Sequence, residues 1–217
     1  DMDGARIYRR SITFLMQAAF EELFPGVILA VDHSVASGGY YCQITNRDPL
    51  TSEELLQLES KMVNMVALDL PLVRQEVPLQ EAIDYFQERG YSDKVRLLKY
   101  RKRDTLVLYR LLDHQDYHHG YMVPSTGYLK WFSISLLGDG FVLQYPRRQS
   151  PTKLLEMPAY PQLLNTFRQY GEWLTRLEID SVGALNDAIQ AGRTREVILV
   201  SEALHERQIA EIAEKIV

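Results

Sequence analysis

Three histidines and an aspartate fall within six residues: His114, Asp116, His118 and His119. Imidazole and carboxylate groups bind metal ions and transfer protons near neutral pH. On a β-strand His114, Asp116 and His118 would share one face, because successive side chains alternate. The segment therefore predicts a metal or proton-transfer site or, as the simpler alternative, a polar edge strand whose histidines face water.

A second group of chemically useful residues is basic. Residues 94–103 contain six lysines and arginines, and Tyr91 and Tyr100 are interleaved with them. Cations of this kind bind phosphates, and aromatic rings stack on bases. The candidate phosphate-binding residues are Lys94, Arg96, Arg101 and Arg103. The simpler alternative is the solvated end of a helix, where cations favour the C-terminus.

Other patterns narrow the range of activities. The sequence contains neither Gly-x-x-x-x-Gly-Lys-Ser/Thr nor Gly-x-Gly-x-x-Gly, so it lacks the usual loops for ATP or a dinucleotide. Ser37-Gly38-Gly39 predicts a hairpin turn, with an anion-binding loop as the alternative. Cys42 lies in an apolar segment and is expected to be a buried, unreactive thiol.

Composition sets further limits. The chain has 217 residues and a net charge of −5, which argues against a dedicated nucleic-acid binder. Its single cysteine excludes a disulfide framework and a cysteine-rich zinc site, and fits a reducing cytoplasm. No apolar run reaches the ~18 residues of a membrane span. The abrupt first and last residues suggest a piece excised from a longer protein.

The elements that must position these residues follow from periodicity and turn signals. Apolar residues at three- and four-residue steps predict a helix over about 9–23, and Thr51 or Ser52 caps another that runs to about Leu68. Further helices are expected from Pro78 to Arg89 and over 93–99. Strands are expected over 27–31, 40–44, 72–77, 105–109, 128–134 and 140–145, with a hairpin turn at 138–140.

Helices mixed with mostly antiparallel strands predict the α+β class. Residues 146–158 contain three prolines and indicate a linker. Everything beyond it predicts helices, among them one that Ser181 caps and Gly192 ends. We therefore expect an α+β domain over residues 1–150 and a helical region over 151–217, whose apolar residues Leu163, Phe167, Tyr170 and Trp173 share one face.

The order of these segments resembles a known module. Leu23-Phe24-Pro25-Gly26 ends the first helix, Gly39-Tyr40-Tyr41 follows, and Gly120-Tyr121-Met122-Val123-Pro124 comes later. By these three segments, residues 8–145 resemble the editing domain near the N-terminus of threonyl-tRNA synthetases. That domain is related to the editing domain of alanyl-tRNA synthetases. The resemblance implies hydrolysis of mischarged aminoacyl-tRNA, with zinc in some members.

The metal ligands implied by that resemblance are not retained. The editing domains carry His-x-x-x-His on the first helix and Cys-x-x-x-His on a later segment. Here Arg10 and Phe14 stand for the two histidines, His118 for the cysteine and Met122 for the last histidine. A guanidinium and a phenyl ring do not bind Zn²⁺, and a thioether suits softer metals. The resemblance therefore implies the fold without a metal site.

A second resemblance covers nearly the whole chain. Met122-Val123-Pro124-Ser125-Thr126-Gly127-Tyr128 and Val182-Gly183-Ala184-Leu185-Asn186, among other segments, resemble the N-terminal region of bacterial uridine kinase-like proteins of the phosphoribulokinase family. There an editing-like module precedes a kinase domain. This implies that no cofactor binds the present chain, and that ATP and Mg²⁺ bind a C-terminal kinase domain, its expected partner.

We expect, first, a non-catalytic binding module in which the cleft corresponding to the editing site holds a nucleotide or RNA. The candidate pocket residues are Arg10, Phe14, Tyr41, His118 and Met122. Arg10 would offer a cation to phosphate, and the aromatic residues would pack against a base or ribose. The alternatives are an aminoacyl-tRNA deacylase that uses His114, His118 or His119 as general base, and a structural or homodimerising arm formed by residues 159–217.

Overall fold

In the computed structural model, the described residues are 1–35, 38–156 and 161–215, with side chains from Asn165 onward in the last range. Contacts divide the chain into two compact units, residues 1–82 with 103–159 and residues 83–102 with 160–217. The predicted boundary at residue 150 stays a prediction. All pairs of described strands are antiparallel and helices pack with them, which confirms the α+β class.

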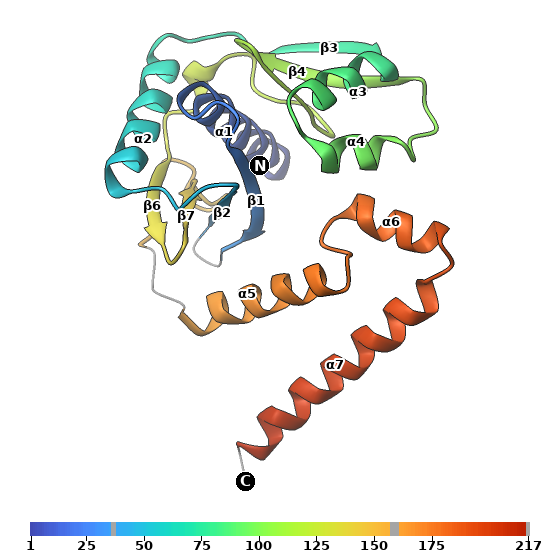
Figure 1. Cartoon of the computed structure of the whole chain (residues 1–217). Helices are drawn as coiled ribbons and strands as arrows, with labels where there is room; N and C mark the ends of the chain where they lie inside the picture. Colours follow the sequence, from blue (N-terminus) through green and yellow to red (C-terminus); the bar gives the residue numbers. More distant parts are fainter. Residues whose placement is uncertain (36–37, 157–160, 216–217) are drawn as a thin grey trace. The chain divides into compact units, whose positions relative to one another are not determined.

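Helix α1 (Met2–Leu23) is central to the first unit (Figure 1). It begins seven residues earlier than its apolar stripe predicts, because Asp1 caps it by accepting a hydrogen bond from the Gly4 amide. Its residues from Ser11 to Met16 are all buried. Helix α2 (Ser52–Ala67) contacts α1. Thr51 caps it, which is one of the two caps that the sequence predicts, and Thr51 and Glu54 bond each other's backbone in a capping box.

Four strands form one sheet in the order β1-β2-β7-β6. They are β1 (Ile28–Ser34), β2 (Gly39–Thr45), β7 (Gly140–Gln144) and β6 (Ser133–Leu137). The predicted hairpin turn joins β6 to β7, with Gly138 in the left-handed region at φ +59°. Ser37 of the predicted glycine turn lies outside the described residues, whereas Gly38 has φ +95°.

A second sheet carries the histidine segment. Its order is β3-β4-β5, with β3 (Val73–Pro78), β4 (Thr105–Leu111) and β5 (His114–Tyr117). The histidine segment therefore forms an edge strand, as one alternative predicts. However, its histidines are not all solvated: His114 and Asp116 are buried, because this side of β5 packs against α1.

The strand predicted over 128–134 is wrong in its first part. The structure has a 3₁₀ turn, η1 (Thr126–Tyr128), and β6 starts only at Ser133. The Thr126 hydroxyl donates to the Met65 carbonyl and accepts from the Leu70 amide, which fixes η1 against the end of α2. The Tyr8 hydroxyl bonds both the amide and the carbonyl of Trp131. These tertiary bonds hold the segment away from a strand conformation.

One apolar core joins α1 and α2 to both sheets. Its fully buried side chains include Ile12, Phe14, Leu15, Met16, Leu58, Met62, Leu111 and Phe141. Cys42 belongs to the same core, as expected. Its burial raises the pKa of the thiol to about 12. The residues around position 14 are therefore interior and tightly surrounded.

The second unit is helical. Most of α3 (Leu79–Glu88) lies in it, with α4 (Ser92–Leu98), α5 (Pro161–Arg176), α6 (Val182–Gln190) and α7 (Thr194–Glu214). Ser181 caps α6 as predicted, and α6 packs against α4. Helix α7 has no buried residue. None of the helices in the described parts combines the length and the apolar character needed to cross a membrane.

Candidate functional site

Four of the five predicted pocket residues lie on the middle of α1 or on the segment that follows β5. Arg10 and Phe14 are one turn apart on this helix, so they face the same side. His118 and Met122 follow β5, which packs on α1. The ring centroids of Phe14 and His118 are 5.5 Å apart. Two of the positions that the resemblance singles out, Phe14 and His118, are therefore in contact.

Phe14 fills the centre of this group. Its side chain has no exposed surface, and its ring also contacts His114 and Tyr109, at centroid distances of 5.0 and 6.4 Å. The Tyr109 hydroxyl donates to the Gly120 carbonyl at 3.2 Å and accepts from the Met122 amide at 3.3 Å. The Phe14 side chain therefore fills the space in which the sequence predicts a cleft.

Arg10 lies at the outer end of the group and is half-buried. Its guanidinium donates from Nη1 to the Tyr121 carbonyl. It lies directly over Gly120, where an added Cβ would come within 2.9 Å of Nη2. Gly120 has φ +112°, a conformation that glycine adopts without strain. A permanent cation therefore stands where the resemblance would place a metal ligand.

His114 forms the most specific polar contact nearby. Its Nδ1 bonds the Glu21 carboxylate of α1, and its Nε2 has no hydrogen-bond partner among the described residues. The His114 side chain is 4% exposed and that of Glu21 19%. Asp116, also buried, accepts from the Tyr117 amide at 2.8 Å. The sequence singled out His114 but gave no sign of Glu21, which is 93 residues away.

Within the described residues, no ring contact or hydrogen bond joins Tyr41 to this group. It lies on β2, where its ring packs beside His33 at 5.1 Å and its hydroxyl accepts from Gln43 at 3.3 Å. His119 is exposed, with its ring 6.1 Å from Tyr117. Within the described ranges, no three His, Cys, Asp or Glu side chains are grouped so that they could hold a metal ion.

The basic segment is largely engaged inside the helical unit. The Lys94 ammonium lies 4.4 Å from the centroid of the Tyr91 ring, and Arg96 pairs with Asp187 of α6. The Tyr100 hydroxyl donates to the same carboxylate, which keeps the pKa of Asp187 below its usual range. Arg101 is half-buried, and Arg103 is exposed in the first unit. Lys94 and Arg96 are thus already used in packing.

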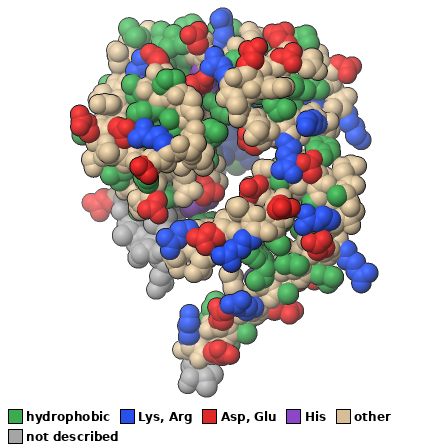
Figure 2. Space-filling view, viewed as in Figure 1, with side chains coloured by type: hydrophobic (Ala, Val, Ile, Leu, Met, Phe, Trp, Pro, Cys, Tyr) green, Lys and Arg blue, Asp and Glu red, His purple; other side chains and the backbone are tan. Residues whose placement is uncertain are grey.

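Basic and acidic side chains are interspersed over the face in Figure 2, as expected for a net charge of −5.

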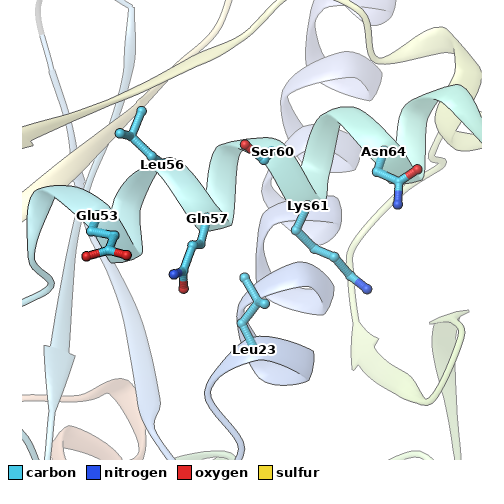
Figure 3. A pocket seen from close by; sticks show the side chains of 7 residues that line it. All are labelled: Leu23, Glu53, Leu56, Gln57, Ser60, Lys61 and Asn64. Atoms are coloured by element: carbon cyan, nitrogen blue, oxygen red, sulfur yellow. The ribbon is translucent and has the colours of Figure 1, made fainter.

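Figure 3 shows a shallow pocket that sequence reasoning missed, on the outer side of α2. It is lined by Leu23, Glu53, Leu56, Gln57, Ser60, Lys61 and Asn64. Leu56 of this pocket is exposed, and Lys61 is paired with Glu22.

Comparison with known proteins gives a consistent result. The chain is 36% identical over 142 residues to the threonine–tRNA ligase of Laribacter hongkongensis and 34% to that of Marinobacter nauticus. Each match covers 65% of this chain and 22% of the relative. This chain is similar to threonine–tRNA ligases. It spans about a quarter or less of their length.

A longer match extends the comparison. It is to the threonine–tRNA ligase of Legionella pneumophila, 30% identical over 177 residues, or 81% of this chain and 27% of the relative. No family model matches the chain. These relatives support the editing-module resemblance, whereas nothing in them supports a uridine kinase parent.

Proposed function

We propose that this chain is an accessory module of the threonine–tRNA ligase editing type that has lost metal-dependent hydrolysis. The similarity to threonine–tRNA ligases supports the type of module. The burial of Phe14 between His114, His118 and Tyr109 carries the proposed loss of hydrolysis. A hydrolytic centre needs an open position for water beside the scissile ester, and the phenyl ring takes that space.

Arg10 adds an electrostatic argument. A zinc ion carries two positive charges, and a guanidinium stays protonated at all physiological pH values. A cation at the first ligand position repels a metal ion and attracts an anion. The module proposed here therefore binds the anionic part of a ligand at this position and does not activate water there.

A second candidate function is a metal-independent editing hydrolase. It is favoured by the relatives, which are tRNA ligases, and by the His114–Glu21 pair. A carboxylate bonded to Nδ1 of a histidine orients the ring and leaves Nε2 as general base. We rank this function second because His114 is buried and its Nε2 faces the interior.

Deacylation measurements separate the two candidates. The 217-residue chain is incubated with seryl-tRNA and, separately, threonyl-tRNA, with Zn²⁺ and with a chelator. We expect the rate of ester hydrolysis to equal that of the tRNA alone in all four mixtures. Faster hydrolysis that disappears in His114→Ala would overturn the proposal in favour of the hydrolase. The same loss in His118→Ala would assign the chemistry to that residue.

A gain-of-function variant tests the geometry behind the proposal. The fourfold change Arg10→His, Phe14→His, His118→Cys and Met122→His restores the ligand pattern that the resemblance implies. If the four positions converge, the variant binds one Zn²⁺ per chain in a dye-competition titration, and wild type binds none. Zinc binding by wild type, or none by a folded variant, contradicts the proposed arrangement.

A further inference from the structure

Two guanidinium groups converge on one exposed tyrosine. Arg10 of α1 donates to the carbonyl of Tyr121, and Arg74 of β3 lies over its ring, with 5.8 Å between Cζ and the ring centroid. Tyr121 is 69% exposed. It follows directly on Gly120, over which the Arg10 guanidinium rests. The three residues therefore form one surface feature, which we call the arginine–tyrosine site.

The arginines of this site have hydrogen-bonding capacity to spare. A guanidinium has five N–H donors. In the described parts of the chain, Arg10 uses one bond, to the Tyr121 carbonyl, and neither Arg10 nor Arg74 forms an ion pair with a carboxylate. Fork-shaped donors of this kind suit the oxygens of a phosphate. The site can accordingly accept an anion without first breaking a salt bridge.

In the described part of the chain, no acidic residue of this sheet forms an ion pair with Arg74. Glu76, two residues along β3 on the same face, is exposed and accepts a hydrogen bond from the Thr105 hydroxyl. Arg74, Tyr109 and Asp116 lie opposite one another on β3, β4 and β5 and so share one face. Asp116 is two strands from Arg74, about 10 Å away by strand spacing. It is also buried, and it accepts a bond from its neighbouring amide. Arg74 thus lies over the Tyr121 ring without an ion pair to either carboxylate in the described residues.

Tyr121 supplies the aromatic part of the site. Arg74 lies over one face of its ring, and the large exposed fraction leaves ring surface accessible to a ligand. A tyrosine ring stacks on any nucleobase, and a guanidinium plane extends such a stack. Its backbone is held in place by Arg10, and the Met122 amide beside it is held by Tyr109. The ring is thus carried on a fixed segment.

From this combination we infer that the arginine–tyrosine site binds a nucleotide, with its phosphate between the two guanidinium groups and its base against Tyr121. The inference rests on the proposed function and gives it a ligand class. The shared chemistry is a phosphate next to a nucleobase, which a free nucleotide and the end of an RNA strand both provide. No bond of the ligand is made or broken at the site.

The test is calorimetric titration of the full chain with AMP, adenosine, inorganic phosphate and a 5′-phosphorylated RNA tetranucleotide. We expect AMP to bind at least tenfold more tightly than adenosine or phosphate. Tighter binding of the tetranucleotide than of AMP assigns the site to an RNA end, and equal affinity assigns it to a free nucleotide. Absence of binding by both AMP and the tetranucleotide overturns the inference.

Variants localise the binding. Arg74→Gln and Tyr121→Leu change exposed side chains, so the fold should be retained, and each is expected to weaken AMP binding tenfold or more. The control variant is Arg110→Gln. Arg110 is an exposed residue of β4, and its side chain lies on the opposite face of the sheet from Tyr109 and Arg74. This substitution should leave the affinity for AMP unchanged. Equal losses in all three variants would overturn the assignment to this site.

The deacylation assay keeps this inference separate from the proposed function. Nucleotide binding without ester hydrolysis supports both. Hydrolysis together with binding overturns the proposed function and leaves the site in place. Absence of binding without hydrolysis overturns the site alone.

Discussion

The phenyl ring of Phe14 meets the imidazole of His118 edge-on, with an interplanar angle of 85°. Both residues stand where the editing resemblance implies metal ligands, so their contact shows that the two positions still face each other. A fully buried ring at position 14 now holds the two segments together by packing. The position that the resemblance assigns to a metal ligand is thus part of the apolar core in this chain.

Removing this ring should be costly. Phe14→Ala leaves a cavity beside His114, His118 and Tyr109 and is expected to lower the free energy of unfolding by about 3–5 kcal/mol. Urea denaturation followed by circular dichroism measures the change. Tyr128→Ala, at a 61% exposed aromatic residue, is the control and should cost little. A loss below about 1 kcal/mol for Phe14→Ala would show that the ring is not packed as described.

The His114–Glu21 pair should contribute to stability. Glu21→Ala leaves Nδ1 of a buried histidine without its partner and is expected to cost about 1–3 kcal/mol in unfolding free energy. Glu22→Ala removes the partner of Lys61 at an exposed site on the same helix, and about 0–1 kcal/mol is expected there. Equal effects of the two substitutions would mean that the buried pair contributes no more than a surface pair.

Cys42 should resist modification in the folded chain. Burial raises its pKa from 9.0 to about 12, so almost no thiolate forms at pH 8. We expect no reaction with a thiol reagent until the chain is unfolded in urea. Rapid labelling under native conditions would contradict the burial of this side chain.

The same burial gives a pH dependence. The pKa of Cys42 is higher in the folded than in the unfolded state, and that of Tyr8 is likewise raised from 10.0 to about 12, chiefly by burial. A raised pKa contributes stability that is complete below the unfolded value and is lost as pH rises. Unfolding free energy should therefore fall between about pH 9 and pH 12. Cys42→Ala should flatten this fall, and an unchanged slope would contradict the assignment.

Gly120 is expected to tolerate no larger residue. Gly120→Ala places a Cβ within 3.0 Å of three atoms of the Arg10 guanidinium and requires a positive φ, so we expect a larger loss than the about 1–2 kcal/mol that the backbone conformation alone costs. Gly90→Ala has a similar positive φ with nothing near the added Cβ, and isolates the backbone cost. If the two substitutions cost the same in thermal unfolding, the contact with Arg10 is not restrictive.

In the helical unit, Asp187 links α4 to α6. Tyr100 donates to its carboxylate and Arg96 pairs with it, so its pKa is lowered. A lowered pKa contributes stability that is present above the unfolded value and lost as pH falls through the folded one. Asp187→Asn should speed amide hydrogen exchange in α6 at pH 7. Unchanged exchange would show that the cluster does not hold the two helices together.

Local signals in the sequence predicted much of the fold. The helix cap at Thr51 or Ser52, the hairpin at Gly138 and the cap at Ser181 depend on neighbouring residues only, and the structure confirms all three, with Thr51 as the first cap. The strand expected from Tyr128 was wrong because distant partners, Tyr8 and Met65, decide the conformation of that segment. Propensity carries no information on such partners.

The candidate site could be predicted only in part. The resemblance pointed to positions 10, 14, 118 and 122. Phe14 and His118 are in contact, and Arg10 bonds the Tyr121 carbonyl next to Met122. It could not show that Phe14 is fully buried, that Glu21 pairs with His114 or that Arg74 lies over Tyr121. Each of these contacts depends on how distant segments pack against one another, and local sequence patterns do not predict that packing.

The Thr126 hydroxyl also bears on the order of folding. Its two bonds join it to residues 61 and 56 positions earlier in the chain, Met65 and Leu70. Contacts over such long separations require closing a large loop, so they form after the local helices and hairpins. We therefore expect the junction between α2 and β3 to be completed late. During synthesis, that junction waits until residue 126 has left the ribosome.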